Sequence, residues 1–315
     1  MNSFPPLPAE RLFTHFLDEV DGTVCLPATA TAADLEALLQ PHALRFPLFL
    51  DPAKPLRDQM AASTFAPASC RFGPFCDNIP GMNWRLPSGQ VVRIGERVVK
   101  TTTGYDWLRF VLHSGTRYGE PVDYVIRLRP DCGFTLTTRF HGPPDRLTAC
   151  IPQLLGNGWM HWWDSVDLIH DTSGCCLRVV VHCMPHEAPL FTERLAAIAA
   201  GTAGVTLTSN EPRPDAPDGL PDLVLKTTPD RAITLAGELA PRVSRSLALC
   251  YNGVVHVHLQ PGPDLPERTH ALALGVAAEL HEMGGDWHSH HLPAIPPSLT
   301  ESSWISILEQ ALHGS

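Results

Sequence analysis

Proline is the residue that most constrains this chain. The sequence contains 31 prolines among 315 residues, about twice the usual frequency. Because proline fixes φ and lacks a backbone N–H, it interrupts helix interiors and central strands and favours turns. We therefore expect many rigid turns and few long helices, with irregular segments at residues 41–80 and 206–222.

The overall composition excludes several classes of protein. Hydrophobic residues make up 44% and charged residues 18%, which argues against disorder, coiled coil and a membrane span. The net charge of −10 argues against nucleic acid as a partner, because binding to phosphates relies on basic side chains. The nine cysteines form no Cys-x-x-Cys pair, and no signal peptide precedes the first elements. We expect free thiols and a cytoplasmic location.

The spacing of apolar residues predicts an α+β fold. The expected helices are residues 9–20, 31–39, 190–200, 230–240 and 269–283. The expected strands are residues 23–27, 83–86, 91–94, 122–128, 134–140, 177–183 and 253–259. The sequence contains no G-x-G-x-x-G, Walker A, G-x-S-x-G or H-E-x-x-H motif, so it gives no support to the enzyme classes that those motifs define.

A series of short sequence motifs, or words, between residues 42 and 130 gives the strongest indication of a family. In order along the chain, these words are Leu44-Arg45-Phe46-Pro47, Leu50-Asp51-Pro52-Ala53, Arg71-Phe72-Gly73, Asp77-Asn78-Ile79-Pro80-Gly81, Leu86-Pro87-Ser88-Gly89, Val98-Val99-Lys100 with Gly104-Tyr105-Asp106, Ser114-Gly115-Thr116 and Arg127-Leu128-Arg129-Pro130. Their order and spacing resemble the FAD-linked oxidases, which are vanillyl-alcohol-oxidase-like flavoproteins with a PCMH-type FAD-binding domain. The likeness is greatest to the flavin subunit of glycolate oxidase and to D-lactate dehydrogenases.

This resemblance implies a division of the chain. It gives an N-terminal helix (1–19), a truncated PCMH-type FAD-binding subdomain (20–131) and an α+β, ferredoxin-like cap domain (132–315). The family positions for cofactor binding fall on Pro52, Asp58, Gln59, Ala62, Gly73, Asn78, Lys100, Gly104 and Tyr105.

Two departures from the family pattern concern the diphosphate of FAD. Too few residues precede Val24 to hold the family's first subdomain with its "GGGT" loop. In the second loop, Asp58 and Gln59 replace two glycines, and their side chains would obstruct the approach of a phosphate to the backbone. We therefore expect FAD to be bound weakly, or to be shared with a partner chain, which would be a second flavoprotein or redox subunit.

The second half contains histidines at two family positions. His256 matches the histidine of "GxGNLHL", and His290 and His291 match the last glutamate and the histidine of "GGTISGEHG". The resemblance implies His256 and His291 as catalytic residues, and His256, His258, His290 and His291 as ligands of a divalent metal. Alternation along a strand places His256 and His258 on one face. The structural alternative is a pair of solvated histidines.

Three functions remain open. The first is an FAD-linked oxidoreductase subunit that acts on a small 2-hydroxy acid, with His256 taking the hydroxyl proton. The second is a degenerate, non-catalytic interaction subunit without flavin, and the third is a histidine-rich metal-binding protein. Arg127 and Arg129, which flank Leu128, either face a carboxylate or are solvated.

Overall fold

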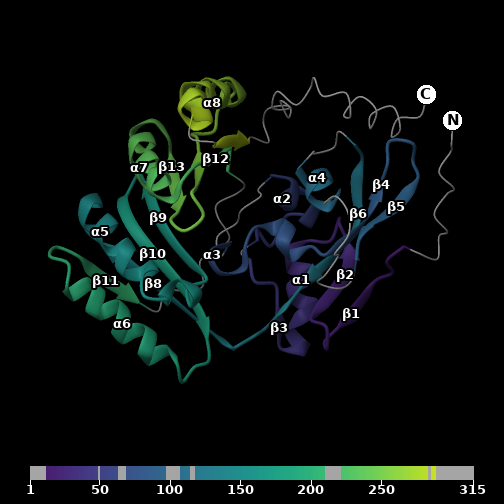
Figure 1. Ribbon diagram of the computed structural model, residues 1–315, viewed down its shortest axis with the longest axis horizontal. Coiled ribbons are helices and arrows are strands. Elements are labelled where there is room, and N and C mark those ends of the chain that lie inside the picture. Colours follow the sequence, from purple (N-terminus) through teal and green to yellow (C-terminus); the bar gives the residue numbers. More distant parts are fainter. Residues whose placement is uncertain are drawn as a thin grey trace.

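Two antiparallel sheets make up the body of the protein. The computed structural model describes residues 12–48, 50–62, 69–96, 107–113, 118–209, 221–282 and 285–288. A five-stranded sheet belongs to the first half and an eight-stranded sheet to the second. The two halves lie side by side, with helix α3 (Ser69–Phe72) between them (Figure 1). The mixture of helices and antiparallel strands confirms the predicted α+β class.

The first sheet has the strand order β1-β2-β6-β4-β5. Its strands are β1 (Phe16–Asp18), β2 (Thr23–Pro27), β4 (Gly81–Arg85), β5 (Val91–Gly95) and β6 (Glu120–Arg127). The other elements of this half are α1 (Ala32–Leu39), α2 (Leu56–Ala62), α4 (Trp107–His113), the 3-10 turns η2 (Gln40–His42) and η3 (Phe75–Asn78), and the short strand pair β3 (Leu44–Arg45) and β7 (Arg129–Pro130). The strands predicted at residues 83–86 and 91–94 are confirmed as β4 and β5, which pair as an antiparallel hairpin across the turn sequence Pro87–Gln90.

The helix predicted at residues 9–20 is wrong for the part that the structure describes. Residues 16–18 form β1, in which Phe16 pairs with Cys25 of β2. The Asn83 side chain accepts a hydrogen bond from the Phe13 N–H (3.0 Å) and donates to the Phe13 carbonyl (2.8 Å), so the chain before β1 is held extended. Gly22, at φ +59°, completes the turn into β2. Long-range pairing therefore overrides the helical spacing.

Helix α1 begins where the sequence predicts. Thr31 Oγ1 accepts a hydrogen bond from the Asp34 N–H (3.1 Å), and Asp34 Oδ2 accepts one from the Thr31 N–H (2.9 Å). This reciprocal capping box satisfies two backbone donors that the first turn would otherwise leave open. Leu35 and Leu39 of the same helix are buried in the core of the first half.

The second sheet has the strand order β11-β8-β10-β9-β13-β14-β12-β15. Its strands are β8 (Phe134–His141), β9 (Ser165–Asp171), β10 (Gly174–Cys183), β11 (Thr206–Ser209), β12 (Leu223–Lys226), β13 (Arg245–Leu249), β14 (Val254–His258) and β15 (Asp286–His288). Its helices are α5 (Pro144–Leu155), α6 (Ala188–Ala200), α7 (Pro229–Leu239) and α8 (Leu265–Glu282), with the 3-10 turns η4 (Trp159–His161) and η5 (Ala240–Arg242).

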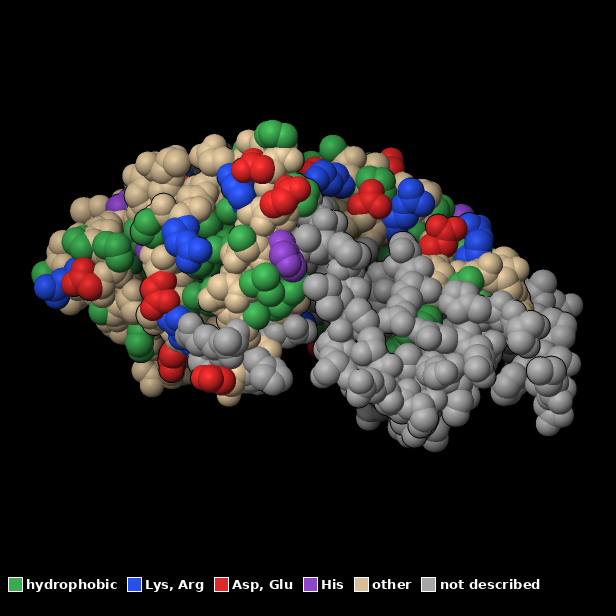
Figure 2. Space-filling view, turned by 90° about the horizontal axis from the view of Figure 1, so that it is seen from above, with side chains coloured by type: hydrophobic (Ala, Val, Ile, Leu, Met, Phe, Trp, Pro, Cys, Tyr) green, Lys and Arg blue, Asp and Glu red, His purple; other side chains and the backbone are tan. Residues whose placement is uncertain are grey.

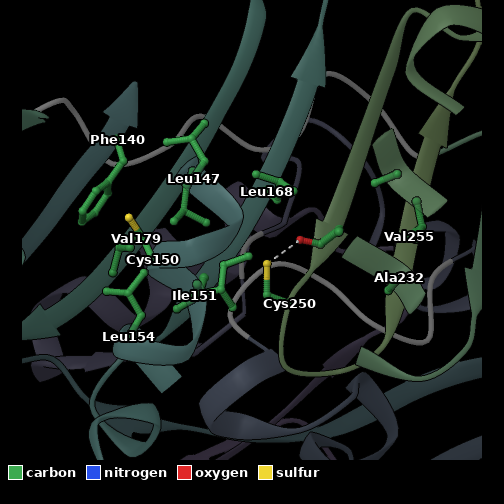
Figure 3. Packing of buried hydrophobic residues seen from close by; sticks show 14 of the residues in the cluster. Phe140, Leu147, Cys150, Ile151, Leu154, Leu168, Val179, Ala232, Cys250 and Val255 are labelled. Atoms are coloured by element: carbon green, nitrogen blue, oxygen red, sulfur yellow. Dashed lines mark hydrogen bonds between the residues drawn. The ribbon is translucent and has the colours of Figure 1, made fainter. Parts of the chain in front are cut away.

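Helix packing on one face of this sheet forms the larger core. Leu147, Ile151 and Leu154 of α5 lie against the strands that carry Leu168 and Val179 (Figure 3). Their spacing of three or four residues gives α5 one apolar face. Full burial of each such side chain contributes about 1.5–3 kcal/mol. In Figure 3 the apolar face of α5 meets the side chains that β9 and β10 turn toward the helices.

The long loop predicted at 206–222 is wrong at its start. Residues 206–209 form β11, an edge strand paired with β8, and Leu207 packs against the helix-side core opposite Phe140. The alternating Thr-Leu-Thr sequence suits an edge strand with one partly buried side chain. Residues 210–220 lie outside the described residues.

The surface seen from above carries charges of both signs. Figure 2 shows acidic and basic side chains interspersed along the rim of this face, without a continuous basic area. Among the helices that the structure describes, none has the length and apolar character needed to cross a bilayer.

Candidate functional site

The face of the eight-stranded sheet opposite its helices meets the first half of the protein. On β10, Val179 and Val181 belong to the helix-side core, whereas Val180 between them is buried in the core of the first half. The period-two alternation of a strand thus gives the second sheet one face for its helices and one for the first half. We take this second face as the candidate site because it carries His256.

His256 lies on an interior strand of the sheet. In β14 it pairs with Leu247 on one side and with Val224 on the other. Only 2% of His256 is exposed, and Val224 and Leu247 belong to a small apolar cluster on this face. The imidazole is therefore beside apolar side chains. His258 shares its face two residues later and is partly exposed.

The last two histidines of the predicted metal set come shortly after strand β15 in the sequence. His288 of β15 is not one of the predicted ligands; its backbone pairs with Val224, so one strand separates it from His256. His290 and His291 lie outside the described residues. Within the part of the chain that the structure describes, no three His, Cys, Asp or Glu residues are close enough together to hold a metal ion.

Gln59, predicted at the flavin loop, stabilises a turn. Its Oε1 accepts a hydrogen bond from the Asp51 N–H (2.6 Å), and its Nε2 donates to the carbonyls of Asp51 (2.9 Å) and Lys54 (2.9 Å). Only 3% of Gln59 is exposed. The amide therefore closes the turn that carries the exposed Pro52 and satisfies three backbone groups.

The neighbouring residues do not fit a diphosphate. Asp58 lies in the first turn of α2, and its side chain is 52% exposed beside Arg57 (3.4 Å between Oδ1 and Nε). A carboxylate repels a phosphate at this position, and the buried Gln59 side chain takes the place of bare backbone. Ala62 is the last residue of α2. We conclude that the described part of this loop does not fit the FAD diphosphate. Lys100, Gly104 and Tyr105 lie outside the described residues.

The turn from Gly73 to Asn78 depends on a glycine and on a buried amide side chain. Gly73 has φ +74°, and a Cβ there would lie 2.8 Å from Asp77 Oδ2. The fully buried Asn78 donates hydrogen bonds from Nδ2 to the carbonyls of Phe72 (3.0 Å) and Pro74 (3.1 Å). Asp77 pairs with Arg109 of α4. Both predicted residues therefore fix this turn internally.

Two buried carboxylates at the junction were missed by the sequence analysis. Asp164 accepts hydrogen bonds from Arg45 Nη2 (3.0 Å) and Arg71 Nη1 (3.3 Å), so it joins the two halves. Asp167 accepts from Arg178 Nη2 (2.7 Å) and Nε (3.1 Å). No local pattern marks these residues, because their partners lie on other segments of the chain.

The burial of Asp164 opposes its ionisation. Its side chain is 1% exposed, and burial raises the pKa of its carboxyl group, whereas the guanidinium groups of Arg45 and Arg71 lower it. Burial and the charges of Asp167 and Asp164 raise the pKa of the nearby Cys70 thiol to about 12. Cys70 is therefore a protonated, weakly nucleophilic thiol near neutral pH.

Relatives of known sequence match part of the chain. No family model matches it. An uncharacterised FAD-linked oxidoreductase of Mycobacterium tuberculosis, present in strains CDC 1551 / Oshkosh and ATCC 25618 / H37Rv, is 27% identical over 109 residues, which is 34% of this chain and 23% of that protein. The mitochondrial D-lactate dehydrogenase [cytochrome] of Arabidopsis thaliana is 28% identical over 96 residues, 30% of this chain and 17% of that protein. The match thus spans less than a quarter of each relative. It confirms the resemblance to FAD-linked oxidoreductases.

Solved structures extend this likeness to nearly the whole chain. Alkyldihydroxyacetonephosphate synthase in crystal form P212121 superposes with a TM-score of 0.60 over 96% of this chain and 64% of that chain, at 10% identity. The same synthase in form P1 gives a TM-score of 0.59 over 96% of this chain and 65% of that chain. At this identity the likeness shows a common fold. The chain spans less than two thirds of the length of the synthase.

Proposed function

We propose that this chain is a subunit of an FAD-linked oxidoreductase that acts on a small 2-hydroxy acid, and that a partner chain supplies the loop for the flavin diphosphate. The proposal divides the chain into a truncated PCMH-type subdomain and a ferredoxin-like cap. The observation that carries it is the contrast between two positions. At the position of the diphosphate loop, Asp58 and Gln59 carry side chains where the family has glycines, whereas the turn at Gly73 and the sheet face with His256 are present.

His256 is the residue of this chain that we expect to act on the substrate. It is buried beside apolar side chains on the sheet face toward the first half. A neutral imidazole at this position can accept a hydroxyl proton as a general base.

The visible spectrum of the purified full chain tests the need for a partner. We expect a colourless protein when the chain is produced alone, and a flavin absorption band when it is co-produced with the products of neighbouring genes. Stoichiometric flavin bound by the chain alone would overturn the split site.

His256→Gln in the flavin-containing complex tests the catalytic role. Turnover of D-lactate or glycolate should fall by about 100-fold or more, the usual contribution of a general base, while flavin content stays unchanged. His141→Gln is the matched control, because His141 is a partly exposed histidine of the same sheet, bonded to Thr208 Oγ1 (3.0 Å).

A second function is favoured by the bonds of Gln59. Its amide is fully used in holding a turn, with three hydrogen bonds to Asp51 and Lys54. This is the arrangement expected of a scaffold subunit that holds no flavin. A stable complex with a neighbouring gene product that stays colourless would support this alternative.

A further inference from the structure

Three arginines gather around one aromatic ring at the junction of the two halves. The guanidinium carbons of Arg45, Arg71 and Arg129 lie 5.5, 5.2 and 5.7 Å from the centroid of the Phe72 ring. Strand pairing brings two of them together, because Arg45 of β3 is opposite Arg129 of β7. Arg71 and Phe72 come from α3, a different segment of the same half.

The charges of this Arg45–Arg71–Arg129 cluster are not balanced. Asp164 is the carboxylate that contacts Arg45 and Arg71. Arg129 donates from Nη1 to the carbonyl of Leu128 (3.1 Å), and within the described ranges it forms no ion pair. Two of the three guanidinium groups therefore share one carboxylate and the third has none, which leaves two positive charges without a counter-charge among these residues.

The cluster is partly buried, and Arg71 is more exposed than Arg45. The side chain of Arg45 is 12% exposed and that of Arg71 is 35% exposed. Burial and then the positive charges of Arg127, Arg45 and Arg71 lower the pKa of Arg129. The surroundings therefore disfavour its charge, while Arg71 keeps the cluster within reach of a solute.

An oxyanion carries the negative charge and the hydrogen-bond acceptors that the three guanidinium groups lack. The face of an aromatic ring attracts cations, so Phe72 offsets part of the repulsion among the guanidinium groups. It cannot accept their N–H groups as a carboxylate or phosphate does, through paired, charge-assisted hydrogen bonds. A bound oxyanion would supply both the missing negative charge and the missing acceptors.

We propose that the Arg45–Arg71–Arg129 cluster is a binding site for an oxyanion, the phosphate or carboxylate group of a small ligand. The site takes this group between Arg71 and Arg129, next to the contact between the halves. This inference does not depend on the proposed flavin chemistry, because it uses only the residues of the cluster.

Direct binding measurements on the full chain test the site. Isothermal titration with inorganic pyrophosphate, orthophosphate and glycolate is run at constant ionic strength, adjusted with sodium chloride, so that screening of surface charges stays the same. We expect saturable binding of at least one probe. Preference for pyrophosphate or orthophosphate identifies a phosphate ligand, and preference for glycolate identifies a carboxylate ligand. The absence of saturable binding for all three probes overturns the proposal.

Two variants locate the binding. Arg129→Gln should weaken it tenfold or more, and Arg129→Lys should weaken it less, because lysine keeps the charge but not the planar fork. Arg93→Gln is the matched control, since Arg93 also lies over an aromatic ring (Phe13, 5.2 Å) but is paired with Glu96 (2.8 Å). Circular dichroism verifies that each variant is folded. Equal affinity of Arg129→Gln and the unchanged chain would place the binding elsewhere and overturn the site.

Discussion

The two sheets are stabilised in different ways. Four helices cover one face of the eight-stranded sheet, and the contacts are almost entirely apolar, as between Leu154 and Val179. The first half has shorter helices, and buried amide side chains hold its irregular segments, Gln59 at the 51–54 turn and Asn78 at Gly73. Apolar contacts tolerate small shifts, whereas amide hydrogen bonds fix positions of the backbone. In the half that resembles a flavin-binding domain, these two described turns are therefore each fixed by a buried amide.

A substitution at the junction between the halves should have the largest effect on the free energy of unfolding. Asp164→Asn removes the carboxylate that contacts both Arg45 and Arg71. Breaking a buried ion pair costs about 3–5 kcal/mol, measured as the free energy of unfolding in urea. The exposed pair of Asp145 and Arg146 (3.4 Å) is the control, and Asp145→Asn should cost less than about 1 kcal/mol. Equal effects of the two variants would contradict a stabilising role for the junction pair.

Leu154→Ala tests the apolar side of the comparison. Leu154 is fully buried between α5 and the second sheet. Removing such a side chain leaves a cavity and costs about 2–5 kcal/mol, which equilibrium unfolding would measure. Leu274→Ala is the control, because Leu274 is 58% exposed on α8. We expect little change there, and a large loss would show that α8 is covered in solution.

Gln59→Leu tests the amide contacts of the first half. The substitution leaves the Asp51 N–H and the carbonyls of Asp51 and Lys54 without their partner. Unpaired buried backbone groups cost about 1–3 kcal/mol, and amide hydrogen exchange at residues 51–54 should become faster. Gln90→Leu, at an exposed hairpin turn, is the control. Unchanged exchange at 51–54 would show that Gln59 does not hold this turn.

The smallest effect concerns the pH dependence of the first helix. The hydrogen bonds from the backbone and then the side chain of Thr31 lower the pKa of Asp34. Because the folded pKa lies below the unfolded value of about 3.9, this carboxylate stabilises the fold above that value, and the stabilisation is lost as the pH falls through the folded pKa. The stability difference between the unchanged chain and Asp34→Asn should therefore shrink in acid, followed by circular dichroism. A difference that stays constant down to low pH would contradict the capping role.

Local chemistry made much of the fold predictable. The capping box at Thr31, the hairpin around Pro87–Gln90 and the α+β class all follow from short-range patterns that the structure confirms. Residues 16–18 were predicted wrongly, since the decisive contacts come from Cys25 and Asn83, which no local window includes.

Some features of the candidate site likewise followed from the sequence, and others did not. The sequence by itself determined the alternation that places His256 and His258 on one face of a strand, and the glycine that the turn at Gly73 requires, because backbone geometry fixes both within a few residues. Only the tertiary structure decided that Gln59 closes a turn and that three arginines and Asp164 meet around Phe72. Gln59 bonds to residues only eight and five positions away, but no local pattern marks a glutamine as the residue that holds a turn. The contacts of the arginines and Asp164 join segments far apart in the chain, and their energies depend on burial and on the other charges nearby, which appear only when the two halves come together.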